Sequence, residues 1–119
     1  MTQYAVLIYE PADPDWSKLD TEEKRQTMAE YGAFGKSVAA VMRGGAALHP
    51  TTTATTVRQE RGEVVTSDGP YAETKEVLTG FYLLECADLD EAVQHASRIP
   101  AARTGSVEVR PVIDFGASG

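Results

Sequence analysis

The sequence predicts an α+β domain built on an antiparallel β-sheet with two helices. Three observations point to this class. Apolar runs of strand length occur near the start, in the middle and near the end of the chain, two helical patterns separate them, and a threonine-rich segment has the composition of a β-hairpin. With 119 residues and 42% hydrophobic content the chain can form one core, and we expect a single domain over residues 1–119.

The first predicted strand is residues 4–9, and a loop follows it. Both alternating sets of its side chains are apolar, which is typical of a strand buried on both faces. Two prolines and two aspartates in residues 10–15 end the strand. Trp16 could fill a groove, but we expect it to pack this loop against the body of the protein.

A long helix is predicted from about Thr21 to Arg43. Asp20 and Glu23 have the spacing of a capping box, and the glycine pair 44–45 ends the helical pattern. Apolar residues at helical spacing form one stripe along this helix. The stripe consists of Met28, Tyr31, Gly35, Val38 and Met42.

The middle of the chain is predicted to contain further strands and a tight turn. Residues 46–48 form a short strand. Residues 57–59 and 63–66 pair as a β-hairpin around the turn at 61–62, because threonine and valine are β-branched and favour strands. The strand at 77–86 is the most hydrophobic of the chain and is apolar on both faces.

A second helix and a last strand complete the pattern. Asp88 and Glu91 form a second capping box, and Pro100 ends the helix. A loop then leads to the last strand, residues 107–113. The apolar stripe of this helix consists of Leu89, Ala92, Val93 and Ala96.

This order of elements is that of the ferredoxin-like split βαβ fold with an inserted β-hairpin. Both helices then cover the same face of the sheet. Because the strands at 4–9 and 77–86 are apolar on both faces, the other face would expose more than the few hundred Å² of apolar patch that monomers usually show. We therefore predict a homodimer whose two sheets pack face to face about a two-fold axis, which is a dimeric α+β barrel.

The composition limits the partners. A net charge of −7 with scattered basic residues argues against nucleic acid, which binds clustered Lys and Arg. No segment resembles a membrane span, a basic amphipathic helix or a secretory signal, so we expect no membrane partner and a cytoplasmic location. The single cysteine, Cys86, excludes an internal disulfide and is expected to be a buried structural thiol.

The histidines do not indicate a metal site. His95 lies about 240° around the helix from Leu89, off the apolar stripe, and is expected in water. His49 precedes Pro50 at a strand end, nearer to a cleft. Neither has a second histidine or a cysteine at ligand spacing, and no G-x-G-x-x-G or P-loop is present, so we expect no metal and no cofactor.

The most informative segment is residues 68–76, Asp-Gly-Pro-Tyr-Ala-Glu-Thr-Lys-Glu. A solvated turn needs only Asp-Gly or Gly-Pro, so the further acid, phenol and lysine suggest a site. In one interpretation, two arginines pair with Asp68 and Glu73 and hold the hairpin against the sheet. In the other, the arginines hold an acidic or phenolic ligand while Asp68 acts as general base. The candidate residues are Asp68, Tyr71, Glu73, Lys75, Arg58, Arg110 and His49.

Four segments resemble the YCII-related family, in its DGPF subgroup. They are Leu-Ile-Tyr at 7–9, Thr-Thr-Val-Arg at 55–58, the 68–76 segment and Glu-Val-Arg-Pro at 108–111. The resemblance covers nearly the whole chain and implies a dimeric α+β barrel and a bacterial protein. Known relatives are mostly of unassigned function; some resemble partners of extracytoplasmic-function sigma factors, and some YCII-like relatives act on chlorinated aromatic rings.

The chain departs from the family pattern at two places. Tyr71 stands where the subgroup usually has Phe, which adds a hydroxyl that can donate a hydrogen bond. The wider family often carries a His in the first helix as part of a proposed His–Asp pair, but here Tyr31 or its neighbours occupy that region. A His-based mechanism is therefore not expected.

Two functions fit these features. The first is an enzyme or binding protein that holds a small acidic or phenolic molecule beside the 68–76 loop, with cofactor-free acid–base chemistry by Asp68. The second is a non-catalytic regulatory or interaction module, for example one that works with a sigma factor. A cofactor-free monooxygenase is a third idea, by analogy of fold alone.

Overall fold

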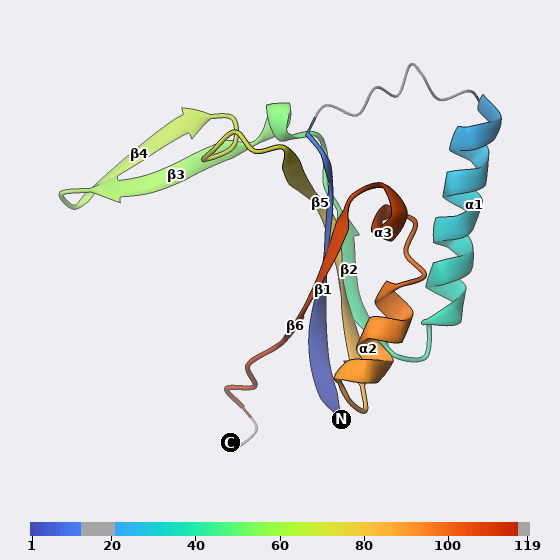
Figure 1. Cartoon of the computed structure of the whole chain (residues 1–119). Helices are drawn as coiled ribbons and strands as arrows, with labels where there is room; N and C mark the ends of the chain where they lie inside the picture. The colour runs from blue at the N-terminus through green and yellow to red at the C-terminus, as the bar shows by residue number, and fades with distance from the viewer. Residues whose placement is uncertain (13–20, 117–119) are drawn as a thin grey trace.

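The computed structural model of the chain describes residues 1–12 and 21–116 (Figure 1). Trp16 and the cap expected at Asp20 lie outside the described residues. Within the described ranges, no helix has the length and apolar character needed to cross a membrane. The elements are β1 (Thr2–Pro11), α1 (Thr21–Ser37), β2 (Met42–Ala47), the 3-10 turn η2 (Thr51–Thr53), β3 (Thr55–Glu60), β4 (Glu63–Asp68), β5 (Glu76–Cys86), α2 (Leu89–Ala96), α3 (Ala101–Thr104) and β6 (Ser106–Pro111).

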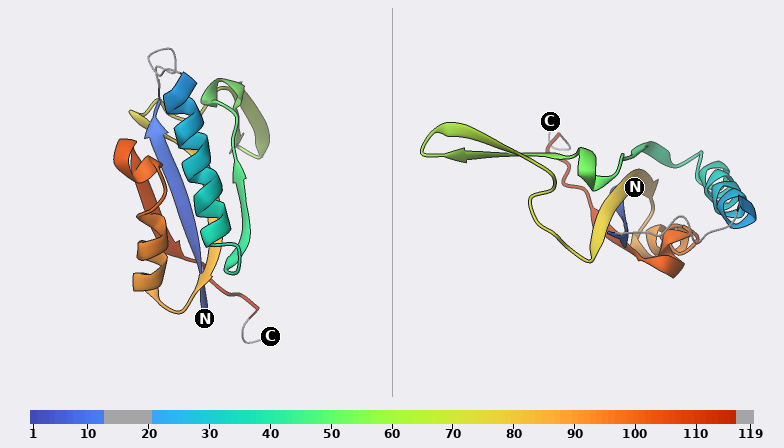
Figure 2. Two further views of the ribbon diagram at one scale, coloured as in Figure 1. Left: turned by 90° about the vertical axis from the view of Figure 1, so that its right-hand side faces the viewer. Right: turned by 90° about the horizontal axis from the view of Figure 1, so that it is seen from above.

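Four strands form the main sheet in the order β2-β5-β1-β6, and every neighbouring pair is antiparallel. α1 connects β1 to β2, and α2 with α3 connects β5 to β6, which is the split βαβ arrangement. All three helices lie on one side of this sheet (Figure 2). The predicted ferredoxin-like fold with an inserted hairpin is confirmed; the short helix α3 occupies what was expected to be a loop.

The core lies between the main sheet and the helices. In β1, Tyr4, Val6 and Ile8 are buried, and Leu84 of β5 and Ile99 after α2 are fully enclosed. Each aliphatic side chain buried in this way stabilises the fold by about 1.5–3 kcal/mol relative to leaving it in water. The core is therefore built from alternate residues of the two central strands, from the helices and from the residues that follow α1 and α2.

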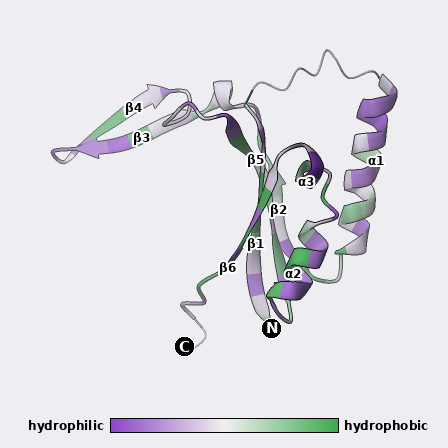
Figure 3. Ribbon diagram, viewed as in Figure 1, coloured by the Kyte–Doolittle hydropathy of each residue, from purple (hydrophilic) through white to green (hydrophobic). Residues whose placement is uncertain are grey.

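α1 packs on the sheet through its C-terminal part. Phe34 and Val38 are buried, and the ring of Phe34 lies 5.1 Å from the ring of Tyr82. Met28, which belongs to the predicted stripe, is 75% exposed, and α1 is mostly hydrophilic along its length (Figure 3). The predicted stripe is therefore wrong at Met28 and missed Phe34, the buried residue of α1, while its buried member Val38 lies just after the helix.

α1 ends at Ser37, so the prediction that this helix reaches Arg43 is wrong. The glycine pair 44–45 lies inside β2 instead of ending a helix. A Cβ on Gly45 would lie 2.7 Å from the carbonyl oxygen of Phe81, and Gly45 has a φ of 156°. Glycine is thus needed at position 45 because β2 approaches β5 closely. The glycine pair reflects this strand packing and does not mark the end of a helix.

β3 and β4 form the predicted hairpin, which projects from the main sheet as a separate two-stranded arm (Figures 1 and 2). Its turn residues Arg61 and Gly62 have φ values of 53° and 83°, as a type I′ turn requires. Val57 and Val64 are 63% and 66% exposed. The arm extends over the side of the main sheet that lacks helices (Figure 1).

The second capping box is confirmed with one change of partner. Asp88 Oδ1 accepts a hydrogen bond from the N–H of Glu91 at 2.9 Å, whereas Glu91 Oε2 accepts from the N–H of Ala87 at 2.9 Å instead of from Asp88. The two alanines of the predicted stripe are buried, but Leu89 and Val93 are 51% and 48% exposed. α2 therefore turns small residues to the core and leaves its larger apolar side chains exposed to solvent.

Candidate functional site

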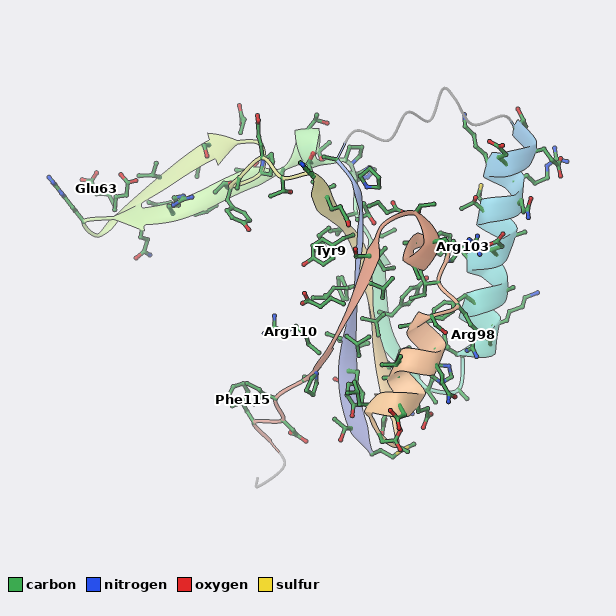
Figure 4. All side chains as sticks on the ribbon, viewed as in Figure 1. Tyr9, Glu63, Arg98, Arg103, Arg110 and Phe115 are labelled. Atoms are coloured by element: carbon green, nitrogen blue, oxygen red, sulfur yellow. The ribbon has the colours of Figure 1, made fainter. Side chains whose placement is uncertain are left out.

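The face of the main sheet opposite the helices is the open face. Side chains alternate along a strand, and the even-numbered residues of β1 from 4 to 8 are buried under the helices. The odd-numbered residues and their register partners therefore point the other way. Figure 4 shows Tyr9 and Arg110 on the side of the sheet away from α1. The open face consists of Ala5, Leu7, Tyr9, Phe81, Leu83, Glu108 and Arg110.

The open face combines an apolar centre with a charged edge. Leu7 and Phe81 are only partly buried in one chain. At the edge, Arg110 Nε lies 4.0 Å from Glu108 Oε2, with both side chains more than half exposed. A solvated pair of this kind contributes about 0–1 kcal/mol, so the guanidinium can exchange this partner for an anionic ligand at little cost.

The backbone of the 68–76 loop is tied to its surroundings at both ends. The N–H of Gly69 donates to the carbonyl of Ala54 at 2.7 Å, and the hydroxyl of Thr56 donates to the carbonyl of Gly69 at 2.8 Å. At the other end, the N–H of Ala12 donates to the carbonyl of Lys75 at 2.8 Å. Gly69 has a φ of 93°, which explains the Asp-Gly pair. The loop is therefore anchored to the arm at one end and to the main sheet at the other.

One chain does not bring the predicted charged residues together. In the register of the hairpin, Asp68 and Arg58 fall on opposite faces of the arm, because side chains alternate along each strand. Arg110 lies on the main sheet and faces Glu108. Among residues 1–12 and 21–116, no ion pair joins either arginine to Asp68 or Glu73. The ion-pair network suggested by the sequence is therefore wrong within a single chain.

The remaining predicted residues lie around the root of the arm and are exposed. Tyr71 is 77% exposed, and Glu73 and Lys75 follow it along the loop. His49 follows β2, whose end is held to β5 by a hydrogen bond from the N–H of Leu48 to the carbonyl of Thr79 at 2.9 Å. These polar side chains lie on one part of the chain but do not enclose a ligand by themselves.

Two hollows on the described surface lie away from these residues. One, of about 490 Å³, lies between α2, α3 and β6, and another, of about 470 Å³, lies at the tip of the arm. The first is lined mainly by apolar side chains, among them Leu89, Val93, Val107 and Val109. Neither is lined by a predicted site residue, so neither is the cleft expected beside the 68–76 loop.

A phenol–carboxylate pair lies between α1 and the end of β1. The hydroxyl of Tyr31 donates to Glu10 Oε1 over 3.5 Å, which is a long hydrogen bond. Burial, the charge of Glu10 and the nearby Tyr82 raise the pKa of Tyr31 to about 12, although the N–H of Ala101 acts in the opposite direction. Tyr31 therefore keeps its proton at neutral pH. The sequence pattern placed Glu10 in a loop, whereas the structure places it in β1. Only its position directly after an apolar strand indicated that its side chain is held against the body of the protein.

His95 is not in bulk water, which corrects the prediction from its place on the helix. Its side chain is 17% exposed, with Arg98 Nη2 at 2.7 Å from Nδ1 and Glu91 Oε1 at 3.7 Å from Nε2. Cys86 is buried, as predicted. The prediction failed for His95 because the end of β5 and the side chain of Arg98 cover a helix face that the apolar pattern marked as exposed.

Comparison with known sequences gives a family and a close relative. A family model described as "YCII-related domain" matches residues 2–116. An uncharacterized protein from Rhizobium meliloti (strain 1021) is 45% identical over 115 residues, which cover 92% of this chain and 90% of that protein.

Comparison with solved structures finds a likeness to 5-chloro-2-hydroxyhydroquinone dehydrochlorinase (TftG) from Burkholderia phenoliruptrix AC1100, in a complex with 2,5-dihydroxybenzoquinone. The TM-score is 0.53, the sequences are 13% identical, and the match covers 98% of this chain and 97% of the other. At this level of identity the likeness shows the fold alone, and it agrees with the topology described above.

Proposed function

The chain belongs to the YCII-related domain family, and on this premise we propose that it is a homodimer of the DGPF subgroup that binds a small acidic or phenolic molecule. The site lies between the open face and the 68–76 loop, and Asp68 moves a proton of the bound molecule without a cofactor. The observation that carries the proposal is the open face itself. It is an apolar sheet surface without helices, edged by the guanidinium of Arg110 and the phenol of Tyr9.

The shape of the chain supports the dimer. The open face and the projecting arm form the two sides of a corner (Figure 1). A lone two-stranded hairpin is marginally stable in water, and this arm exposes Val57 and Val64. A second copy placed in the corner by a two-fold axis would cover both surfaces at once, and the same contacts would cover the second copy. In this packing a surface of the second copy faces the 68–76 loop, and the two surfaces together enclose a cleft.

The chemistry of the corner favours an aromatic or acidic ligand. Leu7 and Phe81 offer an apolar surface to a ring. Arg110 offers a bidentate partner for a carboxylate, or a charge-assisted hydrogen bond to a phenolate. On the loop, Asp68 is the acid–base group and the hydroxyl of Tyr71 is a hydrogen-bond donor. The dehydrochlorinase with the same fold was solved with a hydroxylated quinone, and we extend this class of ligand to the present chain as part of the proposal.

The other polar residues have supporting places in this proposal. Glu73, Lys75 and His49 lie at the root of the arm and line the entrance. Arg58 projects from the face of the arm opposite to Asp68, so it reaches the ligand only when it comes from the arm of the second copy. The site is therefore composite, and a monomer should bind weakly.

Ligand binding by matched variants tests the proposal. Acidic and phenolic compounds, including benzoates, catechols and hydroxylated quinones, are screened by thermal shift, and hits are measured by calorimetry. We expect Arg110→Ala to weaken a hit about 10- to 100-fold, which is the value of a charge-assisted hydrogen bond. Asp68→Asn should abolish turnover of a hit that reacts. Asp90→Asn, the same change on an exposed turn of α2, should alter neither. If no compound binds, or hits bind Arg110→Ala like the parent, the proposal is wrong.

The exposed arm favours a second candidate, a regulatory module that recognises another protein such as a sigma factor. Its tip carries Glu60, Arg61 and Glu63 on a projecting hairpin, which suits edge recognition. Charge reversal at Glu73 and Lys75 separates the two candidates in a pull-down with the sigma factor. Loss of that partner without any small-molecule hit would favour the regulatory function.

A further inference from the structure

The junction of β5 and α2 brings together three side chains that can bind a metal ion. Cys86 is the last residue of β5, and Glu91 and His95 lie one turn apart on the same face of α2. The thiol sulfur, a Glu91 carboxylate oxygen and a His95 ring nitrogen all lie within 4.8 Å of one another. This cluster lies on the helix-covered side of the sheet, away from the open face, and plays no part in the function proposed above.

We propose that Cys86, Glu91 and His95 bind a zinc ion, with water completing the coordination. Thiolate, imidazole and carboxylate are the ligand types that Zn²⁺ takes in proteins, and a soft thiolate with an imidazole disfavours Mg²⁺ and Ca²⁺. Tetrahedral zinc at about 2.0–2.3 Å from each ligand needs ligand atoms roughly 3.5 Å apart. The three side chains therefore have to close by little more than about 1 Å.

The three side chains differ in burial, and the cluster is open to solvent on one side. Cys86 is fully buried, whereas the side chains of Glu91 and His95 are 33% and 17% exposed. The thiol thus forms the floor of the site and the other two ligands form its rim. An ion can arrive from the solvent side past Glu91, and the fourth position can hold water from the same side.

Glu91 can serve the helix cap and the metal at once. Its Oε2 accepts the hydrogen bond from the N–H of Ala87 at 2.9 Å, while its Oε1 is the oxygen that faces His95 Nε2 at 3.7 Å. Ligation through Oε1 therefore leaves the cap intact. The cap also fixes the carboxylate in place, as hydrogen bonds to metal-binding carboxylates commonly do.

The surrounding charge favours a cation. Asp88 Oδ1 accepts a hydrogen bond from the N–H of Glu91 at 2.9 Å, which places a second carboxylate next to the cluster. Zinc would displace the thiol proton to solvent, and the ion would compensate part of the charge of the two carboxylates and the thiolate.

Arg98 competes with the metal for His95. Arg98 Nη2 lies 2.7 Å from His95 Nδ1 and 3.2 Å from the hydroxyl of Ser37. A guanidinium only donates, so Nδ1 accepts and the proton of the neutral ring is on Nε2. Zinc on Nε2 requires the ring proton to move to Nδ1, where Arg98 can no longer donate. Binding of zinc should therefore release Arg98 from His95.

Titration with Zn²⁺ against a chromogenic chelator, and with Co²⁺ as a spectroscopic probe, tests this site. We expect one ion per chain and a thiolate-to-cobalt charge-transfer band in the near ultraviolet. Cys86→Ser should abolish the band, and His95→Gln should weaken zinc binding at least 100-fold. Glu91→Gln should weaken it about tenfold or more. Arg98→Ala should tighten binding severalfold, because the competing hydrogen bond is gone.

The second histidine supplies the matched control. His49→Gln changes an exposed imidazole that follows β2 and does not belong to the cluster, so it should leave zinc affinity unchanged. Circular dichroism checks that each variant is folded, and the partly exposed His95 offers a test that does not disturb the core. A folded parent without a thiolate band, or zinc binding that survives both Cys86→Ser and His95→Gln, would overturn the proposal. So would an Arg98→Ala protein that binds zinc no more tightly than the parent.

Discussion

Replacing Leu7 by aspartate tests the proposed dimer directly. Leu7 lies in the centre of the open face, opposite Phe81 of β5 and Glu108 of β6. In a two-fold dimer with the sheets face to face, both copies of the new carboxylate are taken out of water. In a monomer the same carboxylate stays in contact with water, and the core on the other side of the sheet is untouched.

The expected effect is large because the substitution acts twice in each dimer. Burial of an unpaired carboxylate costs several kcal/mol even after the protein relaxes. A low value of about 2 kcal/mol for each copy gives about 4 kcal/mol per dimer. Since each 1.4 kcal/mol is a factor of ten, the dissociation constant should rise about 10³-fold. A dimer that forms at micromolar concentration would then dissociate almost completely.

Sedimentation velocity at micromolar concentration measures this effect. The parent should sediment as twice the 12.8 kDa chain, and Leu7→Asp as a single chain. Met28→Asp adds the same charge on α1, at a position that is 75% exposed, and should stay dimeric. A parent that sediments as a monomer, or a Leu7→Asp protein that stays dimeric and folded, would refute the packing of two open faces and the composite ligand site.

Two further predictions concern the packing of β2 and the phenol of Tyr31. Gly45→Ala should lower the free energy of unfolding by about 1–3 kcal/mol, because its Cβ would lie 2.7 Å from a backbone oxygen of β5 at a φ of 156°. Gly32→Ala, where no atom lies within 4 Å of the new Cβ, should raise it by about 0.5–1 kcal/mol, and similar urea midpoints for the two variants would contradict this account. Glu10→Gln should lower the pKa of Tyr31 from about 12 toward the ordinary value of 10.0, as measured by ultraviolet titration of the phenolate. Because folding raises this pKa, the stability that the neutral phenol contributes is complete below about pH 10 and is lost as the pH rises to about 12. An unchanged pKa in Glu10→Gln would mean that Glu10 makes no contribution to it.

Local patterns in the sequence were enough to predict the order of the elements. The capping pair Asp88 and Glu91, the turn at 61–62 and the strands that are apolar on both faces each depend on interactions between residues close in the chain. The order of these elements along the chain is that of the split βαβ unit, and it predicted the ferredoxin-like fold. The 68–76 segment was found in the same way, because its Asp-Gly turn and its charged side chains are all local features.

Features that depend on contacts between distant segments could not be predicted from the local sequence pattern. The end of α1 was misjudged because the approach of β2 to β5, and not a helix stop, requires glycine at position 45. Glu10 and Tyr31 meet only because α1 folds back over the end of β1.

The chain's residue types and their local spacing specified a ferredoxin-like fold with an inserted hairpin and with central strands that are apolar on both faces. Register and packing between remote segments settled which side chains meet: they separate Arg58 from Asp68 and join Cys86 to His95. The physical reason is that strand alternation and helix rotation are local rules, whereas the position of one element against another depends on the burial of the whole core.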